Sequence, residues 1–197
     1  TTLAATVDWM AKTRHNVFVC PTDYRDYGFT RWDDWRADLV PELDRRGLLV
    51  EVGGHGFDSF LRPADHPEHP EWFPEDYNVF DIGNEDAVDT YVEAVCDYLA
   101  ARPEVDIFDA WPPDQATWPD RVVDTFGSIA NAYAHLVNGL VAGVAERGLD
   151  VTVEAIAYQS HLEVPDPEYM YDDRVVVDFA AIDRSYAAPI DDPREAA

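Results

Sequence analysis

Lysine is almost absent from this sequence, while acidic residues are abundant. The 197 residues include 40 Asp and Glu against 14 Lys and Arg, and Lys12 is the single lysine. A net charge of −26 leaves little basic surface for phosphate contacts, so neither nucleic acid nor an anionic membrane is an expected partner. Salt relieves self-repulsion at this charge density, so the composition is typical of a protein adapted to high salt.

Cysteine and long apolar runs are also scarce. Cys20 and Cys96 stand far apart with no C-x-x-C, so neither a zinc site nor a disulfide framework is predicted. No apolar run reaches the roughly 18 residues of a membrane span, and no signal peptide is visible. Because the chain opens at Thr1 without Met, the compartment, cytoplasmic or secreted, stays open. A hydrophobic fraction of 47% is still enough for a folded core.

Helical and strand patterns alternate along the chain. Apolar residues recurring every three or four positions predict helices over 3–13, 32–46, 84–101 and 122–147. Compact apolar runs predict strands over 16–20, 48–52, 105–110, 151–157 and 175–179. Such alternation predicts an α/β fold in which helices cover a parallel sheet.

Two architectures fit this order, a (β/α) TIM-type barrel and an open doubly wound sheet. No G-x-G-x-x-G or P-loop motif follows any strand, which disfavours a nucleotide-binding sheet, and no cofactor is predicted. A complete barrel takes about 250 residues. The sequence therefore predicts a partial barrel of about five βα units, forming one domain over residues 1–197 and completed by a further domain or subunit.

The loops that follow the strands differ from those that lead into them. The leading loops are short and plain, whereas the following loops are long and rich in aromatic residues, His and carboxylates. In parallel α/β folds the following loops build the site, and this mixture of side chains suits a sugar. The alternative is a set of loops packed by their own aromatics. The expected sugar-binding residues are His55, Phe57, Trp111, Tyr158, His161, Asp183 and Tyr186.

Glycoside hydrolysis usually needs two carboxyl groups, so their placement matters more than their number. Asp114 lies between Trp111 and Trp118, and apolar surroundings of this kind raise a carboxyl pKa toward that of a general acid. Glu154 and Asp178 lie inside predicted strands and are the candidates for the second catalytic carboxylate. Their alternative reading is structural, as buried carboxylates paired with Arg.

Short motifs in a fixed order resemble domain-of-unknown-function family 4838. The distinctive ones are Gly54-His55-Gly56-Phe57, His69-Pro70-Glu71-Trp72-Phe73 and Trp111-Pro112-Pro113-Asp114. That family resembles glycoside hydrolases of the hexosaminidase and α-glucuronidase kind. The resemblance implies a carbohydrate-active (β/α) barrel with His55 and Asp114 at the site. Relatives often carry Cys soon after the last motif, whereas residues 115–123 here contain none.

Three functions remain open at this point. The first is hydrolysis of a glycosidic bond, and the second is non-catalytic binding of a glycan or of a partner chain in an assembly. The third is a metal-dependent sugar isomerase or lyase that uses His55, Glu154, Asp178 and His161. The first is preferred, and it requires no metal.

Overall fold

The computed structural model describes residues 2–21 and 30–180, together with 187 and 189. Its strands form one parallel sheet in chain order, with bounds β1 (Val17–Pro21), β2 (Leu49–His55), β3 (Ile107–Trp111), β4 (Thr152–Ala157) and β5 (Val175–Phe179). The predicted α/β class and parallel sheet are thus confirmed. The described strands do not close into a barrel, because β1 and β5 are the two edges of the sheet.

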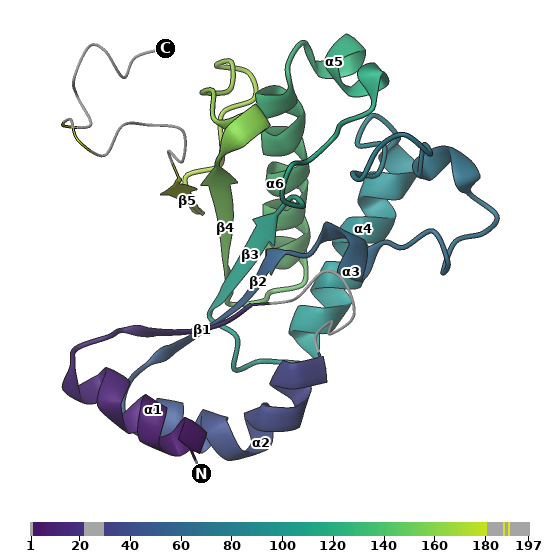
Figure 1. The fold of residues 1–197 in the computed structure, drawn as a ribbon. Coiled ribbons are helices and arrows are strands. Elements are labelled where there is room, and N and C mark those ends of the chain that lie inside the picture. Colours follow the sequence, from purple (N-terminus) through teal and green to yellow (C-terminus); the bar gives the residue numbers. More distant parts are fainter. Residues whose placement is uncertain (1, 22–29, 181–186, 188, 190–197) are drawn as a thin grey trace.

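Helices connect the strands (Figure 1). Their bounds are α1 (Thr2–Lys12), α2 (Thr30–Asp44), α3 (Phe57–Phe60), α4 (Glu85–Ala100), α5 (Asp120–Phe126) and α6 (Ile129–Glu146). Two short 3₁₀ helices, η1 (Pro70–Trp72) and η2 (Gln159–His161), lie in the loops after β2 and β4. Within the described ranges, no helix has both the length and the apolar character that a membrane crossing requires.

The single helix predicted over 122–147 is wrong, since two helices occupy this stretch. Gly127 ends α5 in the left-handed region at φ 80°, which glycine adopts without steric cost. Ser128 then caps α6, and its side chain accepts a hydrogen bond from the Asn131 backbone N–H. The apolar period continues across this break, which is why periodicity alone did not reveal it.

One face of the sheet packs against the helices and forms the core. We call it the helix face; its strand residues are Val50, Val52, Phe108, Ala110, Val153 and Ala155, all buried. Large side chains of α4 and α6, including Tyr91 and Leu140, belong to the same cluster. Figure 1 shows these two helices side by side along the sheet. Burial of this apolar surface is the main force that holds the strands in place.

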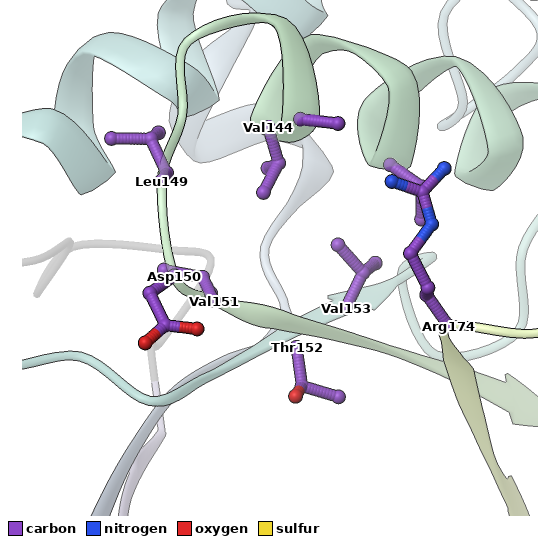
Figure 2. A pocket seen from close by; sticks show the side chains of 9 residues that line it. Val144, Leu149, Asp150, Val151, Thr152, Val153 and Arg174 are labelled. Atoms are coloured by element: carbon purple, nitrogen blue, oxygen red, sulfur yellow. The ribbon is translucent and has the colours of Figure 1, made fainter.

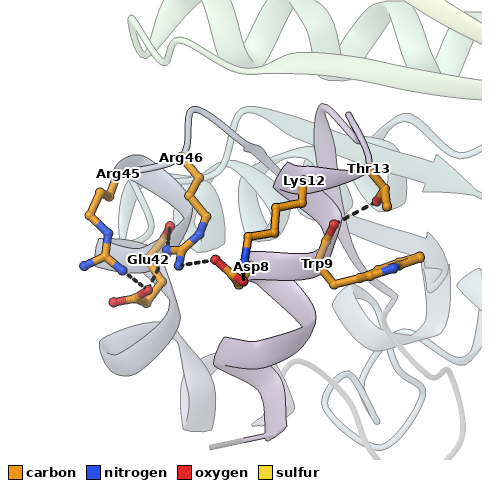
Figure 3. Close-up of polar contacts among 7 residues, drawn as sticks. All are labelled: Asp8, Trp9, Lys12, Thr13, Glu42, Arg45 and Arg46. Carbon is orange, nitrogen blue, oxygen red and sulfur yellow. Dashed lines mark hydrogen bonds and ion pairs between the residues drawn. The ribbon is translucent and has the colours of Figure 1, made fainter.

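The few basic residues tie carboxylates of neighbouring helices together. Asp8 of α1 accepts from Lys12 at 2.5 Å and from Arg46, just after α2, at 3.2 Å (Figure 3). Arg46 also reaches Glu42 at 2.6 Å. These hydrogen bonds lower the pKa of the Asp8 carboxyl. Exposed pairs of this kind contribute little each, so the helix face carries most of the stability.

A buried tyrosine separates the ends of two central strands. The β3–β4 ladder pairs only Ile107–Asp109 with Thr152–Glu154. Beyond it, the Tyr133 hydroxyl of α6 donates to the Ala110 carbonyl at 2.9 Å and accepts from the Ile156 N–H at 3.0 Å. The hydroxyl therefore replaces a strand-to-strand hydrogen bond, and β3 and β4 stand apart at their carboxyl ends.

Candidate functional site

The opposite face of the sheet carries carboxylates. Because side chains alternate along a strand, the residues between the helix-face positions point to the other side. We call this side the acidic face; its carboxylates are Glu51 on β2, Asp109 on β3, Glu154 on β4 and Asp178 on β5. One oxygen each of Glu51, Asp109 and Glu154 lies within 4.8 Å of the others.

Burial and mutual repulsion keep protons on this face. Burial raises the pKa of Asp109 to about 9, helped by the neighbouring charges of Glu51 and Glu154. Burial also raises the pKa of Glu154 to about 7, with Glu51 and Asp178 adding to the effect. The pKa of Glu51 is raised by burial as well, although its contact with Asp109 opposes the shift. Carboxyl groups on this face are therefore protonated in part near neutral pH.

A second group of side chains gathers where β2, β3 and β4 end. The Asp114 carboxylate lies 3.5 Å from His55 Nε2 and accepts from the Tyr158 hydroxyl at 3.4 Å. Trp111 meets the His55 ring edge-on, with centroids 5.3 Å apart. We call His55, Trp111, Asp114 and Tyr158 the rim. Four predicted site residues are thus brought together by three neighbouring strand ends.

The rim fixes the orientation of its histidine. His55 Nδ1 lies 2.5 Å from the Pro112 carbonyl oxygen, which can only accept, so Nδ1 carries the hydrogen. Nε2 is then the atom that faces Asp114. A neutral Nε2 and an ionised carboxylate are both acceptors, so the two groups attract only when one of them holds a proton. This pair can therefore pass a proton to or from a ligand.

Two glutamines with strained backbone link the rim loops. Gln115 and Gln159, just after Asp114 and Tyr158, adopt φ of 54° and 45°, which non-glycine residues rarely do. The Gln159 side-chain oxygen accepts from the Gln115 N–H at 3.1 Å, while its nitrogen donates to the Tyr158 hydroxyl at 3.1 Å. Sequence patterns gave no sign of this contact, because neither residue type favours that backbone region.

Two predicted sugar-binding residues lie inside the protein. Phe57 is 1% exposed and packs against Phe80, Tyr91 and Tyr133, so it has no face for a sugar ring. His161 is 2% exposed, and burial lowers its pKa to about 4. Both are packing residues, and neither is retained in the proposed site.

The environment of Asp114 differs from the one predicted. Its side chain is 48% exposed and contacts His55 and Tyr158, rather than being enclosed by two tryptophans. Trp118 instead donates to the Ser160 hydroxyl at 3.0 Å. The other two predicted residues, Asp183 and Tyr186, lie outside the described part of the chain.

Glu51 and Asp109 were not predicted as site residues. A usable signal was present, because each is an acid between apolar residues of a predicted strand, as Glu154 is. The metal set of His55, Glu154, Asp178 and His161 is not assembled: the described residues that could share an ion are Glu51, Asp109 and Glu154.

Two cavities lie away from the rim. One of about 250 Å³ sits between α6 and the amino ends of β4 and β5, lined by Val144, Leu149 and Arg174 among others (Figure 2). Another of about 370 Å³ is formed by the loop after β2, with Phe73 and Tyr77 in its wall. The first lies at the opposite end of the strands from the rim, so it is not part of the candidate site.

Fold and site together define an α/β protein with a parallel sheet, an acidic face and a histidine–carboxylate rim at the carboxyl ends of the strands. The chain belongs to the family described as Domain of unknown function (DUF4838), whose model matches residues 4–197. The resemblance seen in the sequence motifs is thereby confirmed. Comparison with curated proteins finds no match.

Solved structures resemble this chain at low identity. One is a GH20 catalytic module of the pneumococcal exo-β-D-N-acetylglucosaminidase StrH, with a TM-score of 0.57, 12% identity and 89% of this chain covered. Another is the α-galactosidase of Thermus thermophilus, with a TM-score of 0.47, 17% identity and 78% of this chain covered. The chain spans 54% of the first structure and 34% of the second. At 12% identity the StrH module shows a likeness of fold alone.

Proposed function

We propose that this chain is the carbohydrate-active part of a glycoside hydrolase-like barrel, with the rim as its sugar site. The observation that carries the proposal is the position of Asp114, whose half-exposed carboxylate faces both His55 and Tyr158 where three parallel strands end. Aromatic faces suit the apolar faces of sugar rings, while His and carboxylate groups bind hydroxyls. The fold shared with StrH, named as an exo-β-D-N-acetylglucosaminidase, supports the same class of substrate.

In the proposed mechanism Asp114 donates a proton to the leaving oxygen of the glycosidic bond. His55 Nε2, 3.5 Å away, can take up a proton from solvent and pass it to Asp114. The second carboxylate is Glu154 or Asp178, which would act on the anomeric carbon directly or through water. Glu154, with a pKa of about 7, exchanges its proton near neutral pH and so suits a base.

Further βα units, from a neighbouring domain or subunit, complete the barrel in this proposal. The edge strand β5 leaves Val176, Val177 and Phe179 between 43% and 55% exposed, on both of its faces. Exposed apolar edges favour pairing with another strand. The chain also spans only 54% of the StrH module that it resembles.

Turnover of aryl glycosides at high salt tests the proposal. Wild-type protein is expected to hydrolyse at least one aryl glycoside, and Asp114→Asn is expected to lower kcat by about 100-fold or more, as loss of a general acid does. The matched control is Asp89→Asn, which removes one charge from an exposed position on α4 and should leave kcat unchanged.

The outcomes separate catalysis from binding. Sugar binding without turnover, unchanged in Asp114→Asn, would identify a non-catalytic module instead. If neither binding nor turnover is seen with any glycoside, while the protein is folded, the carbohydrate proposal is wrong.

A further inference from the structure

Three carboxyl groups meet on the acidic face, and no ion pair among the described residues joins them to a basic side chain. Asp109 on β3 is the register partner of Glu154 on β4. On its other side Asp109 pairs with Gly53 of β2, and Glu51 lies two residues before Gly53. One oxygen from each residue lies within 4.8 Å of the other two. The groups that shift their pKa values are all acids, namely one another and Asp178.

One oxygen of the buried carboxyl at the centre lacks a hydrogen-bond donor. Asp109 is 2% exposed, and among the described residues its Oδ1 has no hydrogen-bond partner. A buried oxygen without a donor costs free energy, about 1 to 3 kcal/mol for a neutral group and more for a charged one. Something outside the protein atoms, either a cation or a proton, is therefore expected at this oxygen.

The backbones of β2 and β3 run close together beside this carboxyl. Gly53 has φ 132°, and a Cβ built there would lie 2.4 Å from the Asp109 carbonyl oxygen. Only glycine fits, so no side chain separates Glu51 from His55 along this side of β2.

We infer that Glu51, Asp109 and Glu154 form a binding site for a hard divalent cation, with Ca²⁺ as the best match. Oxygen ligands of Ca²⁺ lie about 2.3–2.6 Å from the ion, so two of its ligands are at most about 5 Å apart. The three oxygens, all within 4.8 Å of one another, fit around one such ion. Mg²⁺ requires shorter and more regular octahedral distances. A +2 ion also relieves the repulsion of three clustered carboxylates.

The site lies directly below the rim along the same strands. Trp111 follows Asp109 by two residues on β3, and His55 follows Glu51 by four residues on β2, so all four point to the same side. A bound ion would hold the ends of β2, β3 and β4 in a fixed spacing under the rim. An ion held by Glu154 would leave Asp178 as the second carboxylate of the proposed hydrolysis, and cation binding can be tested without turnover.

Isothermal titration calorimetry with CaCl₂ tests the inference. The protein is first treated with chelator and dialysed at pH 8 into concentrated NaCl, which screens the exposed carboxylates. Wild-type protein is expected to bind one Ca²⁺ per chain saturably. Asp109→Asn and Glu154→Gln are expected to weaken binding by about 100-fold or more, since even an outer partner of a metal ligand costs 10–100-fold.

Two controls keep the result interpretable. Asp89→Asn removes one exposed charge and should bind Ca²⁺ as wild type does. Circular dichroism in chelator establishes that each variant is folded, and the partly exposed Glu51→Gln provides a milder third variant. Absence of saturable binding in wild type, or binding that survives in all three variants, would overturn the site and assign the cluster to a shared proton.

Discussion

The two faces of the sheet are built from alternate residues of the same strands, yet they differ in chemistry. On β3, Phe108 is buried among the side chains of the helices, whereas the next residue, Asp109, is buried among carboxylates. The helix face gains free energy from apolar burial. The acidic face concentrates like charges, which opposes folding unless protons or a cation compensate. Along each strand, alternate residues thus serve either the stability of the core or the chemistry of the acidic face.

Loss of a large side chain from the helix face should have the largest effect. Phe108 is 1% exposed, so Phe108→Ala should lower the free energy of unfolding by about 3–5 kcal/mol through lost burial and a cavity. Ile107→Ala, one residue earlier and facing the other side, should cost clearly less because Ile107 is only partly buried. Urea unfolding at fixed salt measures both. Equal losses would contradict the division between the two faces.

On the acidic face, the change in the free energy of unfolding caused by a substitution should depend on pH. The folded-state pKa of Asp109 is raised to about 9, above its ordinary value of 3.8, so the folded state holds a proton that the unfolded state releases. The stability contributed by this proton is complete below pH 3.8 and is lost as pH rises to about 9. Relative to wild type, Asp109→Asn in chelator should therefore gain up to about 1.4 kcal/mol per pH unit, or about 3 kcal/mol between pH 5 and 7. A difference independent of pH in urea unfolding would show that Asp109 is ionised.

His161, at the carboxyl end of the sheet, should make the protein less stable as pH falls, which is the opposite of the effect of Asp109. Burial lowers the pKa of His161 from 6.5 to about 4, so below pH 6.5 the unfolded state binds a proton that the folded state does not. Stability from the neutral ring is present above pH 6.5 and is lost as pH falls toward 4. Between pH 6.5 and 5 wild type should lose about 2 kcal/mol more than His161→Phe. Unfolding at pH 8, where the ring is neutral in both states, corrects for altered packing. A parallel loss in both proteins would place the imidazole in water.

The smallest effect is expected on β5. Val176 is 50% exposed on the acidic face, so Val176→Ser should change the free energy of unfolding by no more than about 0.5 kcal/mol. Val153→Ser, on the helix face of β4 at 2% exposure, should cost several times more. Urea unfolding compares the two. A loss above about 1 kcal/mol for Val176→Ser would mean that another chain or domain covers this face in solution.

Much of the architecture could be predicted from sequence alone. The β5 bounds were predicted as observed, and the helix predicted from residue 84 is α4, which Asn84 caps by accepting from the Ala87 N–H. The rim was predictable because aromatic, imidazole and carboxyl side chains followed strands, and parallel strands end at one edge. His55 and Asp114 were placed at this edge before any contact between them was known.

The remainder depended on contacts that local patterns do not encode. Phe57 comes soon after β2 and so was predicted to face the site. It begins α3 instead, and its side chain packs into the core, which its position after the strand does not indicate. Pairing of Gln115 with Gln159 joins loops 44 residues apart. Closure of the barrel requires strands beyond the five that the structure describes, so it remains a prediction.

The hydroxyl of Tyr133 gives α6 control over the spacing of the rim residues. It acts as a spacer one atom thick between Ala110 and Ile156, and the rim residues Trp111 and Tyr158 follow directly on those strands. Without that oxygen, β3 and β4 could hydrogen-bond to each other directly, which would bring the rim residues on the two strands closer together. Tyr133 itself is fully buried. The spacing of the rim is therefore set from inside the core, by a residue that is not itself part of the rim.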